Sequence, residues 1–250
     1  MKKFFAPLFF TLLGCGQHSY DQTDNSVLST SITYEDETYI TVVIGSQTWM
    51  ARNFNYKALG SKCYGEGGYV YNTADGNYNI RLSNEEIQAN CTKYGRLYSW
   101  ATAMALPLRC NFTSCASEIS EKHKGICPPG WHIPSNADWD KLIRFVDGEA
   151  DTGGLYDSET AGKFLKATSG WNTNRGKSGN GTDKYGFAAL PSGFGYSDGD
   201  FEYIGEIGEW WSSDENGSYA YYRDIYYNDL GAYWDYDNKD YFSSVRCLKN

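Results

Sequence analysis

The sequence lacks long apolar runs, has few histidines and shows no excess of positive charge. Its longest apolar run, residues 4–13, is shorter than the ~20 residues that a membrane-spanning helix needs. The chain has 22 basic and 31 acidic residues, a net charge of −9. Bulk electrostatics therefore do not favour nucleic acid or anionic lipid headgroups, and no nucleic-acid partner is predicted.

Motifs for metal and phosphate chemistry are also missing. There is no His-Glu-x-x-His, no phosphate-binding loop and no Cys-x-x-Cys. With only 3 histidines, a zinc site is a weak alternative use of the cysteines. We expect no catalytic residue, no metal site and no cofactor, and we predict that the protein is not an enzyme.

The first residues indicate export. Two lysines precede the short apolar run, as in a secretory signal. The run ends in Leu-Leu-Gly-Cys, which resembles the bacterial lipobox and marks Cys15 for lipid attachment; an ordinary signal peptide with a chance cysteine is the alternative. We expect a signal peptide over residues 1–14, a flexible polar tether over 15–37 and one domain over 38–250. Losing two lysines would leave 20 basic against 31 acidic residues, a net charge of −11.

The predicted location follows from these features. The lipid on Cys15 would be the only membrane anchor, so we expect a protein of the bacterial cell envelope, held at the outer membrane. The sequence does not indicate which leaflet carries it.

The remaining cysteines form an even set, as in exported proteins that contain disulfides. They are Cys63, Cys91, Cys110, Cys115, Cys127 and Cys247. Six cysteines allow 15 pairings, and the residues alone do not choose among them.

Periodicity predicts an α+β fold, with two to three helices and antiparallel strands separated by loops. A strand at 39–44 and a turn at Gly45 predict a hairpin. Apolar spacing predicts helices over 94–107 and 159–166 and after Ser135, whose capping box is completed by Asp138. After residue 172, short aromatic segments between turn residues predict antiparallel strands.

Aromatic residues are abundant, with 8 Trp, 22 Tyr and 12 Phe. Most are expected in the core, but one segment interleaves rings with acidic groups: Tyr233, Trp234, Asp235, Tyr236 and Asp237. Flat rings beside hydrogen-bonding groups suit a sugar. The alternatives are calcium held by the carboxylates and a plain turn that faces water. Paired carboxylates would suit a glycoside hydrolase; the candidates are Glu206, Glu209, Asp214, Asp235 and Asp237.

Six ordered segments resemble the Fibrobacter succinogenes major paralogous domain, a family of exported bacterial proteins. They are VVIGSQTWMARNFNY, CTKYGRLYSWATAM, CPPGWHIPSNADWDKL, YGFAALPSGFGY, GEWWSSDE and SSVRCLKN. Together they cover nearly the whole chain from about residue 38. The family frequently carries an N-terminal lipobox, in agreement with Cys15, and the resemblance implies no established activity.

A more distant resemblance is to C-type-lectin-like folds. It implies two to three helices packed on a small twisted antiparallel sheet with long loops, and the disulfides Cys127–Cys247 and Cys63–Cys91, and with them Cys110–Cys115. The calcium-dependent sugar readers of that superfamily use a Glu-Pro-Asn or Gln-Pro-Asp loop, and neither occurs here. No calcium or sugar-binding residue is therefore carried over. Formylglycine-generating enzymes share a related fold, but their catalytic cysteines have no match in this sequence.

These observations predict a non-enzymatic binding or adhesion role at the cell envelope, with polysaccharide or another envelope component as the partner. A structural envelope protein without a ligand and a secreted polysaccharide hydrolase are the alternatives. The stretch from Cys127 to Ile143 is interpreted as a staple, that is, a segment that holds the fold together and is not an active site. Trp131 and His132 are interpreted as packing and hydrogen-bonding groups within it.

Overall fold

The computed structural model of the chain describes residues 29–72 and 77–250. Cys15, the expected signal peptide over residues 1–14 and the start of the expected tether lie outside the described residues. The described part is mostly sheet, with four α-helices. The helices are α1 (Asn84–Tyr94), α2 (Trp100–Ala103), α3 (Asn136–Asp147) and α4 (Ala161–Leu165). Two short 3-10 turns are η1 (Leu108–Asn111) and η2 (Ala116–Glu118).

One five-stranded sheet joins the two ends of the domain. Its strands, in spatial order, are β1 (Ser29–Tyr34), β2 (Glu37–Ile44), β3 (Gln47–Met50), β16 (Leu248–Lys249) and β7 (Trp131–His132). The predicted hairpin at Gly45 is confirmed, because its φ of 60° suits the turn between β2 and β3. The expected tether is too long, since β1 pairs with β2 along its whole length and begins at residue 29.

Both faces of strand β2 are partly buried. Tyr39, Val42 and Ile44 are buried, whereas Ile40 is 56% exposed and Val43 44% exposed. Successive side chains of a strand point to opposite faces, so Tyr39 and Val43 share one face and Ile40, Val42 and Ile44 share the other. Tyr39 packs in one apolar cluster and Val42 and Ile44 in another, so each face is covered in part.

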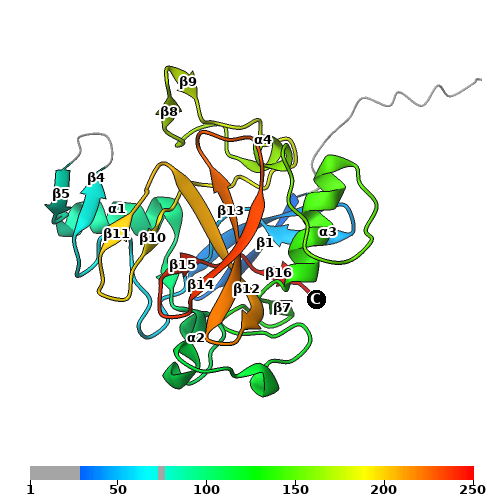
Figure 1. Cartoon of the computed structure of the whole chain (residues 1–250), viewed down its shortest axis with the longest axis horizontal. Coiled ribbons are helices and arrows are strands. Elements are labelled where there is room, and N and C mark those ends of the chain that lie inside the picture. Colours follow the sequence, from blue (N-terminus) through cyan, green and yellow to red (C-terminus); the bar gives the residue numbers. More distant parts are fainter. Residues whose placement is uncertain (1–28, 73–76) are drawn as a thin grey trace, which may run out of the picture.

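The second five-stranded sheet crosses the middle of the molecule (Figure 1). Its spatial order is β14 (Tyr233–Asn238), β13 (Tyr219–Tyr226), β12 (Ile207–Asn216), β15 (Ser243–Ser244) and β6 (Leu97–Tyr98). The three long strands are antiparallel, as the aromatic segments predict. Trp210 and Trp211 are both buried, in separate apolar clusters, so this sheet has core on both faces at β12. Neither ring faces solvent, although adjacent residues of a strand point to opposite faces.

Shorter strands complete the sheet content. The third sheet has the order β10 (Phe194–Gly195), β11 (Phe201–Glu202), β4 (Val70–Asn72) and β5 (Asn77–Ile80). A small hairpin joins β8 (Thr173–Asn174) and β9 (Lys177–Ser178). The β4–β5 pair lies on the opposite side of the molecule from α3 (Figure 1).

Helix α3 confirms its predicted capping. The Ser135 side chain accepts a hydrogen bond from the Asp138 backbone, and the Asp138 side chain accepts one from the Ser135 backbone. Gly148 ends the helix with a φ of 76°, the left-handed conformation that glycine adopts freely. The apolar face of the helix packs into a cluster formed by both five-stranded sheets. The ring centroid of Trp139 lies 4.7 Å from that of Trp49 on β3 and 6.3 Å from that of Trp210 on the second sheet.

The helix predicted over 94–107 is mostly wrong. Its start pairs as strand β6 with β15, and only the short α2 is helical. The longer helix is α1, which has a capping box between Ser83 and Glu86 and ends at Gly95. The expected helix over 159–166 is present as α4.

Three disulfides are present, with the pairing that the resemblance implies: Cys63–Cys91, Cys110–Cys115 and Cys127–Cys247. The last pair is 120 positions apart in sequence. It ties the segment before α3 to the residue before β16. Within residues 29–72 and 77–250, no helix is long and apolar enough to span a bilayer.

Candidate functional site

Trp131 and His132, in the stretch that precedes α3, are buried and make contacts within the fold. His132 is 1% exposed, and its ring nitrogens contact Asn250 Oδ1 at 2.7 Å and Asp138 Oδ2 at 3.4 Å. Trp131 is also buried and lies on β7. Both side chains have structural partners, which favours the interpretation of this stretch as a staple.

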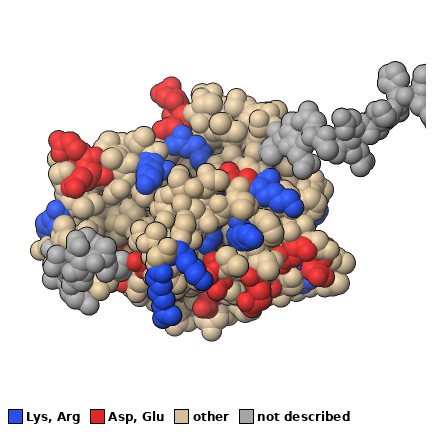
Figure 2. Space-filling view, turned by 90° about the horizontal axis from the view of Figure 1, so that it is seen from above, with Lys and Arg blue, Asp and Glu red and all other residues tan. Residues whose placement is uncertain are grey.

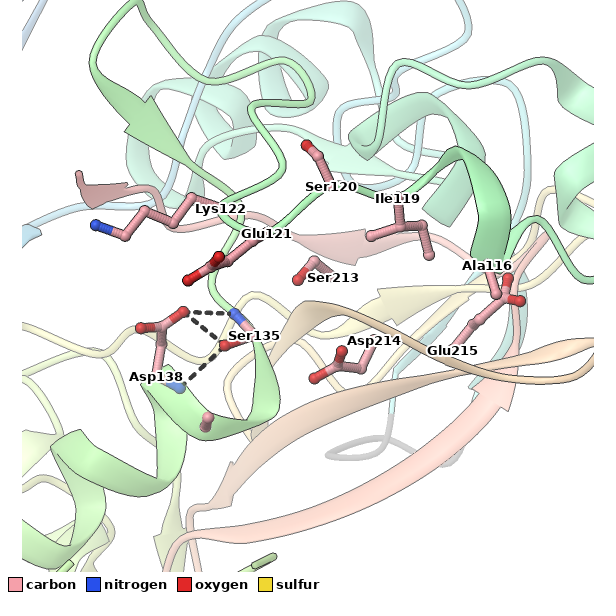
Figure 3. Close-up of a pocket in the computed structure, with 11 residues that line it drawn as sticks. Ala116, Ile119, Ser120, Glu121, Lys122, Ser135, Asp138, Ser213, Asp214 and Glu215 are labelled. Carbon is pink, nitrogen blue, oxygen red and sulfur yellow. Dashed lines mark hydrogen bonds between the residues drawn. The ribbon is translucent and has the colours of Figure 1, made fainter. Parts of the chain in front are cut away.

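A polar hollow of about 560 Å³ opens beside the N-terminus of α3 (Figure 3). Asp138 accepts hydrogen bonds from the backbone and hydroxyl of Ser135. Asp214 accepts one from the backbone of Asn136 at 2.7 Å. Glu215 accepts hydrogen bonds from the Lys239 ammonium at 2.6 Å and from two groups of residues 114–115. These carboxylates hold the fold together, so the hollow is a weak candidate for a ligand site.

The five residues predicted as a ligand loop lie in β14, an edge strand. Successive side chains of a strand point to opposite faces. Trp234 and Tyr236 therefore share one face of the sheet, and Tyr233, Asp235 and Asp237 share the other. The structure does not bring the five together as one site.

On the first of these faces, four rings pack edge to face. Tyr221 lies 5.8 Å from Trp234 and 6.0 Å from Tyr236 between ring centroids, with interplanar angles of 59° and 81°. Tyr219 and Tyr236 are T-shaped, 5.7 Å apart. The rings point their edges at one another and do not form the coplanar platform that stacks on a flat polysaccharide surface.

The opposite face carries a cavity of about 500 Å³, which we call the aromatic–acidic pocket. Strands β10, β12, β13 and β14 contribute to it. Six rings line it: Phe194, Tyr196, Tyr203, Tyr222, Tyr226 and Tyr227. Three acidic residues line it as well: Glu206, Glu209 and Asp237. Rings and acidic groups thus meet here, as the sequence led us to expect for a sugar site, but from different strands.

Two buried carboxyls lie next to each other on this face. Glu209 on β12 and Asp224 on β13 are register partners, and they are 7% and 3% exposed. Ser243 donates a hydrogen bond to Glu209, and the Tyr226 hydroxyl donates one to Asp224 Oδ2 at 2.7 Å. Asp224 Oδ1 has no hydrogen-bond partner among the described residues.

Burial decides the charge of these groups. Loss of solvent, together with the nearby Asp224, Asp237 and Asp235, raises the pKa of Glu209 to about 8. Burial likewise raises the pKa of Asp224 to about 7, although Tyr226 and Arg223 oppose the shift. At neutral pH, Glu209 is therefore largely protonated and can donate a hydrogen bond. Burial also raises the pKa of Tyr222 and of Tyr226, which keeps both hydroxyls neutral.

The other predicted carboxylates divide between the two hollows. Glu206, Glu209 and Asp237 line the aromatic–acidic pocket, and Asp235 lies on the same face of β14. Asp214 belongs to the hollow beside α3. Sequence reasoning missed Asp224 and the rings of residues 194–203, which lie up to 43 positions before Asp237 in the printed sequence. The available signal for Asp224 was its place in β13, two positions after Tyr222 and two before Tyr226, which puts the three side chains on one face.

One hydrolase-like pattern also escaped the sequence analysis. Residues 195–199 read Gly-Tyr-Ser-Asp-Gly, which has the letters of a Gly-x-Ser-x-Gly nucleophile elbow. That elbow requires a turn from a strand into a helix. Here the segment forms the turn between strands β10 and β11, and Ser197 is exposed. The pattern therefore has the wrong structural context for a nucleophilic serine.

A cluster with metal-binding side chains has a simpler explanation. Cys110, Cys115 and Glu118 lie close together. The two sulfurs are bonded to each other, so neither is a thiolate ligand. Arg109 pairs with Glu118 at 2.5 Å.

Comparison with known proteins identifies the family. The sequence model of the Fibrobacter succinogenes major domain matches residues 42–249. No curated protein and no solved structure matches the chain. The match begins within β2, so it leaves out β1, and it spans the whole second five-stranded sheet and the aromatic–acidic pocket. The chain therefore belongs to the Fibrobacter succinogenes major domain family.

Proposed function

We propose that the protein is a non-enzymatic saccharide-binding domain that works at the bacterial cell envelope, with the aromatic–acidic pocket as its binding site. The main support for this proposal is the composition of the pocket, where six rings and three acidic residues line one cavity. Aromatic faces stack on the apolar faces of sugar rings, and polar groups fix hydroxyls. A volume of about 500 Å³ suits a short oligosaccharide.

The cellular setting is part of the same proposal. Lipid on Cys15 would hold the domain at the outer membrane, and three disulfides suit an oxidising compartment. The polysaccharide or other envelope component would then be met outside the cytoplasm.

The finer architecture is proposed to be C-type-lectin-like. The Cys127–Cys247 bond supports it, because it links the segment before α3 to the end of the chain. The pairing of β16 with both β3 and β7 supports it too, since the last strand then closes a sheet begun by the N-terminal strands.

A polysaccharide hydrolase is the second candidate. Its support is the cross-strand pair Glu209 and Asp224, because opposed residues in antiparallel strands have Cβ atoms about 4.5–5.5 Å apart. A protonated acid with a raised pKa beside a second carboxyl is the arrangement of glycosidases. Release of reducing ends from polysaccharides that is lost in Glu209→Gln would favour the hydrolase. Binding without release favours the proposed function.

A glycan array tests the binding site. Wild type should bind, Tyr226→Ala should lose most binding, and Trp234→Ala should retain it, since Trp234 lies on the other face of the sheet. Tyr226→Phe keeps the ring and separates stacking from the hydroxyl contact with Asp224. Thermal melts confirm that each variant is folded. Absence of binding by folded wild type across the array would favour a structural envelope protein instead.

A further inference from the structure

The aromatic–acidic pocket contains no positive charge of its own. Among its lining residues, all within the described chain, three are acidic and none is basic. Asp224 and Asp235 add two more carboxyls to the same face of β13 and β14. A ligand in this pocket therefore meets several acidic groups and no competing ammonium or guanidinium.

The basic residues near this pocket form ion pairs and hydrogen bonds outside it. Arg223 precedes Asp224 but points to the other face, where it donates to Asp140 at 2.5 Å. Lys239 follows β14 and donates to Glu215 and to two backbone carbonyls. Its ammonium also lies 4.4 Å from the ring centroid of Trp100. Neither cation lines the pocket, although Arg223 opposes the rise that burial causes in the pKa of Asp224.

One buried acceptor in this region is unused. Asp224 is 3% exposed, and its Oδ1 has no partner among the described residues. Its strand neighbours on the same face, Tyr222 and Tyr226, both line the pocket. A buried polar atom without a partner costs free energy, which a donor or a cation in the pocket would recover.

We propose that the aromatic–acidic pocket selects a saccharide with a free, protonated amine over its neutral or N-acetylated counterpart. This inference rests on the proposed saccharide-binding function and adds the charge of the ligand. An ammonium group is attracted to the faces of tyrosine rings and to carboxylates. Neutral sugar hydroxyls would not compensate the acidic groups in the same way.

The protonation state of Glu209 should change measurably when an ammonium group binds. The charged groups that act on it are Asp224 from β13 and Asp235 and Asp237 from β14, and all of them raise its pKa. Ser243 from β15 donates a hydrogen bond to it. A bound ammonium favours the ionised form of Glu209, so binding should release protons from the protein.

The test is calorimetry with two hexasaccharide probes of equal length, one of glucosamine and one of N-acetylglucosamine, at mildly acidic pH. We expect the glucosamine oligomer to bind at least about tenfold more tightly. Titrations in buffers of different ionisation enthalpy should show proton release. Glu209→Gln and Asp237→Asn should each reduce the preference, and Glu121→Gln, which removes an exposed charge in the hollow beside α3, should not.

Each outcome has a distinct meaning. Equal affinity for the two oligomers would overturn the charge preference and leave saccharide binding standing. No binding of either oligomer, with folded protein and an empty glycan array, would overturn the proposed function itself. Tight binding of Ca²⁺ that blocks the glucosamine oligomer would overturn the inference in favour of a metal site.

Discussion

Glu209 and Asp224 face each other across the β12–β13 pair, and both are buried. Like charges directly opposed on neighbouring strands destabilise a sheet. Protonation relieves the repulsion, which agrees with the raised pKa of both carboxyls. The protein thus keeps two acidic residues in a place where hydrophobic residues would be more stable, a cost that is typical of functional sites.

This pair should make stability depend on pH. In the unfolded chain, Glu209 loses its proton near the ordinary pKa of a glutamate, whereas in the folded protein it does so at about 8. Between these values the folded state binds more protons, so the free energy of unfolding should fall as pH rises from about 4 to about 8. Glu209→Gln mimics the protonated form and should flatten this fall. Urea unfolding across that pH range measures it.

Asp214→Asn is the matched control, since it removes a carboxylate that accepts a backbone hydrogen bond outside the pocket. It should leave the downward slope between about pH 4 and 8 in place. An unchanged slope in Glu209→Gln would mean that Glu209 does not carry the effect.

The disulfides should contribute unequally to stability. Cys127–Cys247 spans 120 positions and Cys110–Cys115 spans 5. In the chain-entropy model, removing the first by a double serine substitution should cost about 4–5 kcal/mol and removing the second about 2 kcal/mol. Chemical denaturation of the two variants compares them. Equal losses would show that loop length does not determine how much each disulfide contributes to the free energy of unfolding, and that strain or contacts in the folded state do.

The cap of α3 should have a measurable effect. Ser135→Ala removes the side-chain acceptor of the Asp138 backbone N–H and should lower the free energy of unfolding by about 1 kcal/mol. Ser135→Asp retains an acceptor and should recover most of the loss. A Ser135→Ala variant as stable as wild type would indicate that the staple before α3 does not depend on the cap.

A buried ion pair joins α3 to the central sheet, and breaking it should be costly. Arg223 and Asp140 are 2% and 4% exposed, and Asp140→Ala leaves the guanidinium without its charged partner. We expect a loss of about 3–5 kcal/mol. The double variant Arg223→Met with Asp140→Ala should be more stable than Asp140→Ala alone. Thermal unfolding of wild type, Asp140→Ala and the double variant measures this. A double variant less stable than Asp140→Ala would contradict the expectation.

Features encoded by neighbouring residues were predictable from the sequence. The Ser135–Asp138 capping box and the β2–β3 turn at Gly45 depend on a few adjacent positions, and both were found. Helix α1 was missed because its apolar face is weak, although Ser83 and Glu86 form the same capping signature. Capping and turn residues therefore predicted the ends of these elements better than apolar periodicity predicted the helices.

The candidate site could not be assembled from local patterns. Tyr233 to Asp237 were grouped because they are adjacent, but strand alternation sends Trp234 and Tyr236 away from Asp235 and Asp237. The pocket instead joins β10 to β12, β13 and β14. The position of Asp224 opposite Glu209 depends on a register that only the folded sheet shows. The burial of both Trp210 and Trp211 likewise depends on layers packed on each side of the sheet.

The most direct test of the binding site is hydrogen–deuterium exchange with and without the strongest binder from the glycan array. We predict slower exchange in peptides that cover β10, β12 and β13, and no change around Ser120 and Ser135 in the hollow beside α3. Protection confined to that hollow, with unchanged exchange in β10 and β12, would contradict the assignment of the aromatic–acidic pocket as the binding site.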